Sequence, residues 1–119
     1  MDMMGVSASG EIVAATWNLS LQQIVGPVLV TNTWTHVVST YSLSNGFRLY
    51  VNGTHVGSRG PLSFVSPSQT NTLTLGYPAT GSQCSQVSVV SRPYSGYLDE
   101  FRVYSRELNA TDILALANP

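Results

Sequence analysis

The sequence predicts an all-β fold, an antiparallel β-sandwich of the jelly-roll type with one short C-terminal helix. Short runs of alternating apolar and polar residues recur along the 119 residues, with turn signals between them at close spacing. Residues that favour strands are frequent, including six Tyr, three Phe and two Trp. Only the end of the chain has the apolar spacing of a helix. At this length, one domain over residues 1–119 is expected.

The first expected strands lie on either side of Asn18. Residues 11–17 and 19–25 each read as a short strand, and residues 27–30 as a brief extended run.

The next expected strand covers residues 34–41. We expect Trp34 to lie in the core and His36 to be a hydrogen-bonded packing residue. No Cys, Asp or second His lies near His36 in the sequence, so a catalytic or metal-binding role is not indicated.

A β-hairpin is predicted around Asn52-Gly53, a pair that favours a tight turn between strands. Residues 47–51 form its first strand and residues 54–58 its return strand. Alternation places three apolar side chains of the first strand on one face: Phe47, Leu49 and Val51. Asn45-Gly46 supplies the positive φ of the preceding connection.

The second half of the chain is less regular. Residues 60–71 read as a loop, and residues 72–77 as a strand with Leu73, Leu75 and Tyr77 pointing inward. Residues 78–93 form a long segment with a short strand expected at 87–90.

The longest late strand is expected over residues 95–104. Alternation places four of its side chains on one face: Tyr97, Asp99, Phe101 and Val103. A helix should follow, with Asn109 as N-cap, Asp112 completing a capping box, and Leu108 packing onto Ile113.

Charge excludes two classes of partner. Only 9% of the residues are charged, lysine is absent, and five arginines face six acids for a net charge of −1. Such a surface lacks the basic field that binds nucleic acid or anionic lipid, and no stretch is long enough to span a membrane. The single cysteine, Cys84, excludes a disulfide within the chain.

Three sequons mark glycosylation candidates at Asn18, Asn52 and Asn109. Turn formation at Asn52 and helix capping at Asn109 are the structural alternatives. With the low charge, the sequons favour an extracellular or cell-surface setting within a larger secreted protein.

Two blocks of sequence resemble the laminin G-like, concanavalin A-like family. They are Trp34-Thr-His-Val with Leu49-Tyr-Val-Asn-Gly53, and Gly96-Tyr-Leu-Asp-Glu-Phe-Arg-Val-Tyr-Ser-Arg-Glu-Leu108. The resemblance runs from about residue 12 to residue 117 and implies a jelly roll. The opening strands of the family, with their F-S-(I/L)-S-(F/A)-W pattern, have no counterpart here. We therefore expect the C-terminal part of such a domain, or a homodimer in which a partner replaces those strands.

The resemblance also implies a structural calcium ion at Asp99, since relatives often hold one with this aspartate. Hydrogen bonding of Asp99 to backbone or arginine is the alternative. A glycosidase needs two carboxylates on one face, whereas Asp99 and Glu100 are adjacent and point to opposite faces of a strand.

We expect a non-catalytic extracellular module that binds glycan or protein ligands. An aromatic platform with amide groups beside it would suit sugar, and the irregular region after residue 70 offers these residues: Asn71, Tyr77, Gln83, Gln86 and Tyr94. The alternatives are a structural or adhesive spacer without its own ligand, and a glycoside hydrolase of the same superfold.

Overall fold

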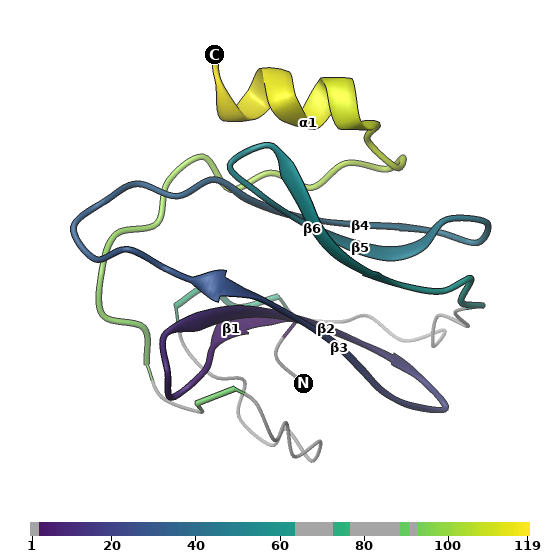
Figure 1. Ribbon diagram of the computed structural model, residues 1–119, viewed down its shortest axis with the longest axis horizontal. Helices are drawn as coiled ribbons and strands as arrows, with labels where there is room; N and C mark the ends of the chain where they lie inside the picture. The colour runs from purple at the N-terminus through teal and green to yellow at the C-terminus, as the bar shows by residue number, and fades with distance from the viewer. Residues whose placement is uncertain (1–2, 64–72, 77–88, 91–92) are drawn as a thin grey trace.

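The computed structural model describes residues 3–63, 73–76, 89–90 and 93–119. Two three-stranded antiparallel sheets stack as layers, and one helix covers the outer face of the second sheet (Figure 1). The elements are β1 (Met4–Val6), β2 (Glu11–Asn18), β3 (Ser20–Val28), β4 (Val37–Ser42), β5 (Gly46–Val51), β6 (Thr54–Arg59) and α1 (Ala110–Ala117). The predicted β-sandwich with a C-terminal helix is confirmed.

The first sheet has the order β1-β2-β3. Strands β2 and β3 correspond to the two strands expected on either side of Asn18, and they form a hairpin that turns at Leu19 with φ of 58°. Strand β1 was not predicted, because its three residues are too few to show alternation. Gly5 in β1 lets Val89 pack closely against the strand, because a Cβ at position 5 would lie 2.4 Å from a methyl carbon of Val89.

The second sheet has the order β4-β5-β6. The predicted turn between β5 and β6 is confirmed: Asn52 and Gly53 have φ of 50° and 81°, the pair of left-handed residues that suits the twist of a two-residue hairpin. The predicted connection before β5 also needs its glycine. Gly46 has φ of 71°, and a Cβ there would lie 2.1 Å from the carbonyl oxygen of Arg59.

The main core lies between the two sheets. The three apolar side chains of β5 that were expected to share a face are buried there, and Leu49 is fully enclosed. They meet side chains of the first sheet and of the chain after β6. The buried members of this core are Ile12, Ala14, Ile24, Phe47, Leu49, Val51 and Leu62.

A second apolar cluster holds α1 against the outer face of the β4-β5-β6 sheet. Tyr50 points away from the main core and packs with Leu108 and Ile113. The predicted capping box is present, because Asn109 Oδ1 accepts from Asp112 N at 2.8 Å while Asp112 Oδ2 accepts from Asn109 N at 3.3 Å. The predicted helix start and its apolar contact are therefore confirmed.

The strand predicted over residues 95–104 is wrong. These residues form no ladder with any part of the chain that the structure describes, and Tyr97, Phe101 and Val103 are exposed rather than grouped on a buried face. Alternation reports a tendency to be extended, but a strand also requires a neighbour to complete its hydrogen bonds.

The prediction for residues 72–77 also fails where it can be compared. Residues 73–76 form no strand, and Leu73 and Leu75 are exposed instead of pointing inward. Val89 and Val90 lie in no strand either, although Val90 N–H donates to the carbonyl of Val6 at 3.0 Å. Residues 64–72, 77–88 and 91–92 lie outside the described residues.

Candidate functional site

Three exposed aromatic side chains gather at one end of the sandwich. Trp34 and Tyr97 have ring centroids 6.4 Å apart with planes inclined at 39°. Their exposed fractions are 68% and 84%, and Tyr94 is 47% exposed. Aromatic rings bury large areas when they bind, so three exposed rings at one place indicate a contact surface. We call Trp34, Tyr94 and Tyr97 the aromatic cluster.

The cluster joins two segments that are far apart in sequence. Trp34 lies on the connection between β3 and β4, and the tyrosines lie on the segment that leads towards α1. Both segments run at the same end of the molecule, at the left of Figure 1. Their meeting is a consequence of tertiary structure, because the whole second sheet, β4 to β6, lies between them along the chain.

Local hydrogen bonds hold the tyrosine segment. Tyr94 N–H donates to the carbonyl of Gly76 at 2.8 Å, and the Tyr94 hydroxyl lies 3.5 Å from the carbonyl oxygen of Tyr97, to which it donates. Gly96 lies between the tyrosines with φ of 155°, and a Cβ there would lie 2.7 Å from the Tyr94 hydroxyl oxygen. The glycine therefore lets the Tyr94 ring fold back while Tyr97 extends into solvent.

Trp34 was predicted in the core, and that prediction is wrong. Strand β4 begins only at Val37, and just before it the Asn52 side chain takes the place of a backbone partner of His36: Asn52 Oδ1 accepts from His36 N at 3.0 Å, while Asn52 N–H donates to His36 O at 2.8 Å. Residue 34 thus lies beyond the sheet, where alternation no longer decides which side chains are buried.

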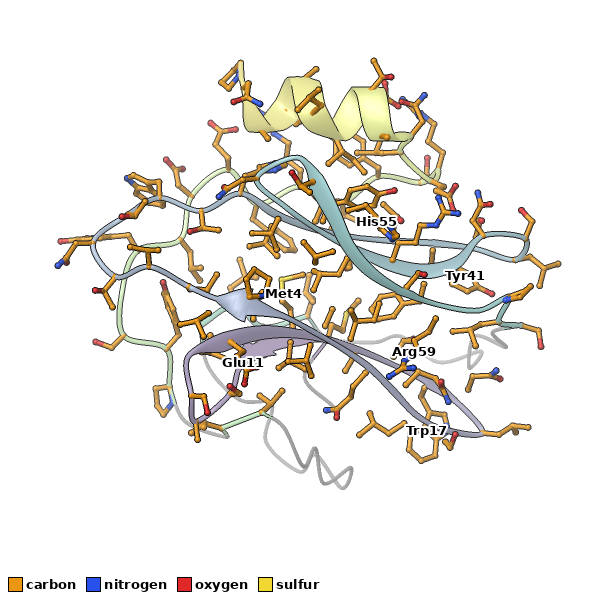
Figure 2. The ribbon with its side chains drawn as sticks, viewed as in Figure 1. Met4, Glu11, Trp17, Tyr41, His55 and Arg59 are labelled. Atoms are coloured by element: carbon orange, nitrogen blue, oxygen red, sulfur yellow. The ribbon has the colours of Figure 1, made fainter. Side chains whose placement is uncertain are left out.

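His36 is hydrogen-bonded through its backbone rather than through its ring. Its Nδ1 atom is buried and has no partner among the described residues. His55 is exposed after the turn (Figure 2), and its ring centroid lies 5.2 Å from that of Tyr50.

Of the predicted ligand-binding residues, the structure brings Tyr94 into the aromatic cluster. The other four, Asn71, Tyr77, Gln83 and Gln86, lie outside the described residues. Sequence reasoning overlooked Trp34 as a surface residue. The polar run Thr31-Asn-Thr33 before it was the available signal, since such runs are typical of loops.

Asp99 is exposed and accepts a hydrogen bond from Glu100 N–H at 2.8 Å, so the expected backbone contact is present. Calcium takes about six to eight oxygen ligands. Within residues 3–63, 73–76, 89–90 and 93–119, no three His, Cys, Asp or Glu side chains come together. These residues do not fit a calcium ion by themselves, and the calcium site at Asp99 stays a prediction.

Two of the three sequon asparagines have structural roles. Asn52 pairs with His36, and Asn109 caps α1. Asn18 stands at the end of β2 beside Leu19, which is 93% exposed. A glycan on Asn52 or Asn109 would disturb the side-chain hydrogen bond that each of them makes. If the chain carries a glycan, the geometry therefore favours Asn18.

Acidic side chains tie the start of α1 to its surroundings. Glu107 Oε1 accepts from the Asn45 side chain at 2.7 Å, and contacts with Ser42 and Asn45 lower the pKa of Glu107. Arg106 donates to Asp112 at 3.0 Å and lowers the pKa of that carboxyl. These contacts explain the position of the helix and do not indicate a catalytic role.

Comparison with known proteins decides the family. A laminin G-type family model, described as the concanavalin A-like lectin/glucanases superfamily, matches residues 2–114. The chain belongs to this superfamily. A search of curated proteins found no match. No helix among the described residues has the length and apolar character to cross a membrane.

One solved structure of this general fold is similar over most of the chain. It is the crystal structure of residues 221–444 of an S-layer domain-containing protein from Clostridium thermocellum, with a TM-score of 0.64 and 28% identity. The match covers 92% of this chain and 52% of that one, so this member of the superfamily spans about half of its structural relative.

Proposed function

We propose that this superfamily member is a non-catalytic module that binds a neutral glycan through the aromatic cluster. The observation that carries the proposal is the exposed Trp34–Tyr97 pair, whose rings are 6.4 Å apart and inclined at 39°. Two tilted rings present a shallow apolar surface on which the C–H face of a sugar ring can pack. The hydroxyls of Tyr94 and Tyr97 would supply polar contacts at its edge.

Charge supports an uncharged ligand. The aromatic cluster contains no Asp, Glu, Lys, Arg or His side chain. The charged residues that follow Tyr97 are Asp99, which accepts a hydrogen bond from Glu100 N–H, and Glu100 and Arg102, which form an ion pair with each other. An anionic ligand would find no unpaired cation among these three groups. The superfamily includes lectins by its description, which is consistent with a sugar ligand.

We propose a non-enzymatic role because Asp99 and Glu100 are not arranged like the two carboxylates of a glycosidase. A retaining or inverting glycosidase needs two free carboxylates on opposite sides of the bond that it cleaves. Asp99 and Glu100 are adjacent, the first accepts a backbone hydrogen bond, and the second is paired with Arg102. This arrangement supports a binding module rather than a hydrolase.

The proposed setting is the cell surface or the extracellular space. The structural relative is an S-layer domain-containing protein, and the low charge of this chain is compatible with such a location. The same relative favours a second candidate function, a structural or adhesive spacer of a surface protein that has no ligand of its own.

Binding to a panel of neutral polysaccharides, including β-glucan, xylan, mannan and galactan, tests the proposal. We expect W34A and Y97A each to weaken binding at least about tenfold, which corresponds to about 1.4 kcal/mol. W17A is the matched control, because Trp17 is also exposed but lies at the β2–β3 hairpin, away from the β3–β4 connection (Figure 2). Binding that W34A and Y97A leave unchanged would contradict the proposed site. A folded chain that binds no member of the panel would favour the spacer.

A further inference from the structure

Residues 97–104 carry a run of exposed apolar side chains outside the two sheets. Tyr97, Leu98, Phe101, Val103 and Tyr104 are between 43% and 84% exposed. An apolar run of this size on the surface of a soluble domain marks a place where another surface is buried.

The backbone of this run is available for pairing. Residues 97–104 form no ladder with the part of the chain that the structure describes. Glu100 has φ of 55°, a left-handed conformation that is uncommon for a residue other than glycine. Within the run, Glu100 N–H donates to Asp99 Oδ1 and the carbonyl of Tyr97 accepts from the Tyr94 hydroxyl. Pairing with a further strand would replace such local contacts and return Glu100 to the extended conformation.

We infer that residues 97–104 pair with the same residues of a second copy of this chain, as two antiparallel strands. A two-fold axis through Phe101 would place the two copies of this residue opposite each other. In that register Leu98 faces Tyr104 and Glu100 faces Arg102, and each of these contacts occurs twice.

This register sets Glu100 opposite Arg102 and apolar residues opposite each other at positions 98, 101 and 104, with Asp99 opposite Val103 as the exception. The charge match is the reason to prefer a second copy over an unrelated strand. Glu100 and Arg102 already attract each other within one chain, and their side chains are 70% and 51% exposed. In the dimer each would meet the opposite charge across the strands, while aromatic and aliphatic residues meet each other. The net charge of −1 opposes association little.

Sedimentation over a range of concentrations tests the inference. The wild-type chain should dimerise, while E100R and R102E should each weaken the dimer at least tenfold, because each puts like charges opposite one another. The double variant E100R/R102E should restore it. An equimolar mixture of the two single variants should also form a dimer, because their charges are then complementary. Both substituted positions are exposed in the single chain, so loss of folding is not expected, and circular dichroism checks this.

Cysteine cross-linking tests the register. In a C84S background, F101C should form an intermolecular disulfide readily, because residue 101 meets itself across the axis at a distance that a disulfide spans. Y104C is the matched control, since residue 104 meets residue 98 and should cross-link poorly.

Several results would overturn the inference. They are a folded wild-type chain that stays monomeric at the highest concentration, single charge variants that dimerise as the wild type does, and a mixture that does not recover. Protection of residues 97–104 from hydrogen exchange only within a longer, monomeric protein would also overturn it, because the covering strand would then belong to the same chain.

Discussion

At the scale of single residues, the tightest constraints lie at turns and at the aromatic cluster. The side chain of Asn52 influences whether Trp34 is buried or exposed. By accepting a hydrogen bond from His36 N, it takes the place of a backbone partner just before β4 begins, and Trp34 lies beyond the sheet, in solvent. The surface role of Trp34 therefore depends on a residue that is distant in sequence, and local alternation could not predict it.

Gly46 should be among the least replaceable glycines. We expect G46A to lower the free energy of unfolding by about 2–4 kcal/mol, because it combines an unfavourable positive φ with a contact of 2.1 Å to the backbone oxygen of Arg59. Denaturant unfolding measures the change. G10A is the control, since Gly10 also has positive φ but its added Cβ would lie 3.4 Å from Val28 Cγ1. Equal effects of the two variants would show that the close contact does not matter.

At the scale of elements, the hairpins and the helix follow from local signals. Turn residues with positive φ join β4 to β5 and β5 to β6, and a capping box begins α1. Such signals act over a few residues, so they are readable from the sequence. Residues 95–104 are different, because their alternation is correct for a strand but the described sheets offer them no ladder.

The N-cap of α1 should have a measurable effect on stability. We expect N109A to lower the free energy of unfolding by about 0.5–2 kcal/mol, since it removes the acceptor for Asp112 N–H. N18A should change stability much less, although both asparagines belong to sequons. Thermal or urea unfolding compares the two variants, and similar losses in both would contradict the assigned roles.

At the scale of the whole molecule, apolar contacts on both faces of one sheet join three layers. Residues of β5 point alternately into the main core and towards α1, so a single strand links the sandwich to the helix. Polar contacts of Glu107 and Asp112 complete the junction at the start of the helix.

This junction should make stability fall in acid. The ordinary pKa values of Glu107 and Asp112 are 4.5 and 3.8, and both pKa values are lowered in the folded chain, the first by Ser42 and Asn45 and the second by Arg106. Groups with lowered folded pKa contribute stability above their unfolded pKa, and that contribution is lost as pH falls through the folded pKa. We therefore expect less stability at pH 3 than at pH 7 by urea unfolding. The double variant E107Q/D112N should depend less on pH over this range, and an unchanged dependence would contradict the assignment.

The sequence by itself determined the fold class, the presence of the strands from β2 to β6, the hairpin between β5 and β6, the inward face of β5 and the capped helix. These features depend on the conformational preferences of neighbouring residues and on side-chain alternation, which act locally. Tertiary structure alone decided that Trp34 is exposed beside Tyr97 and that residues 97–104 lack a ladder. Burial and strand pairing both depend on partners that are distant in the chain, or that belong to another one, and no local pattern records whether such a partner is present.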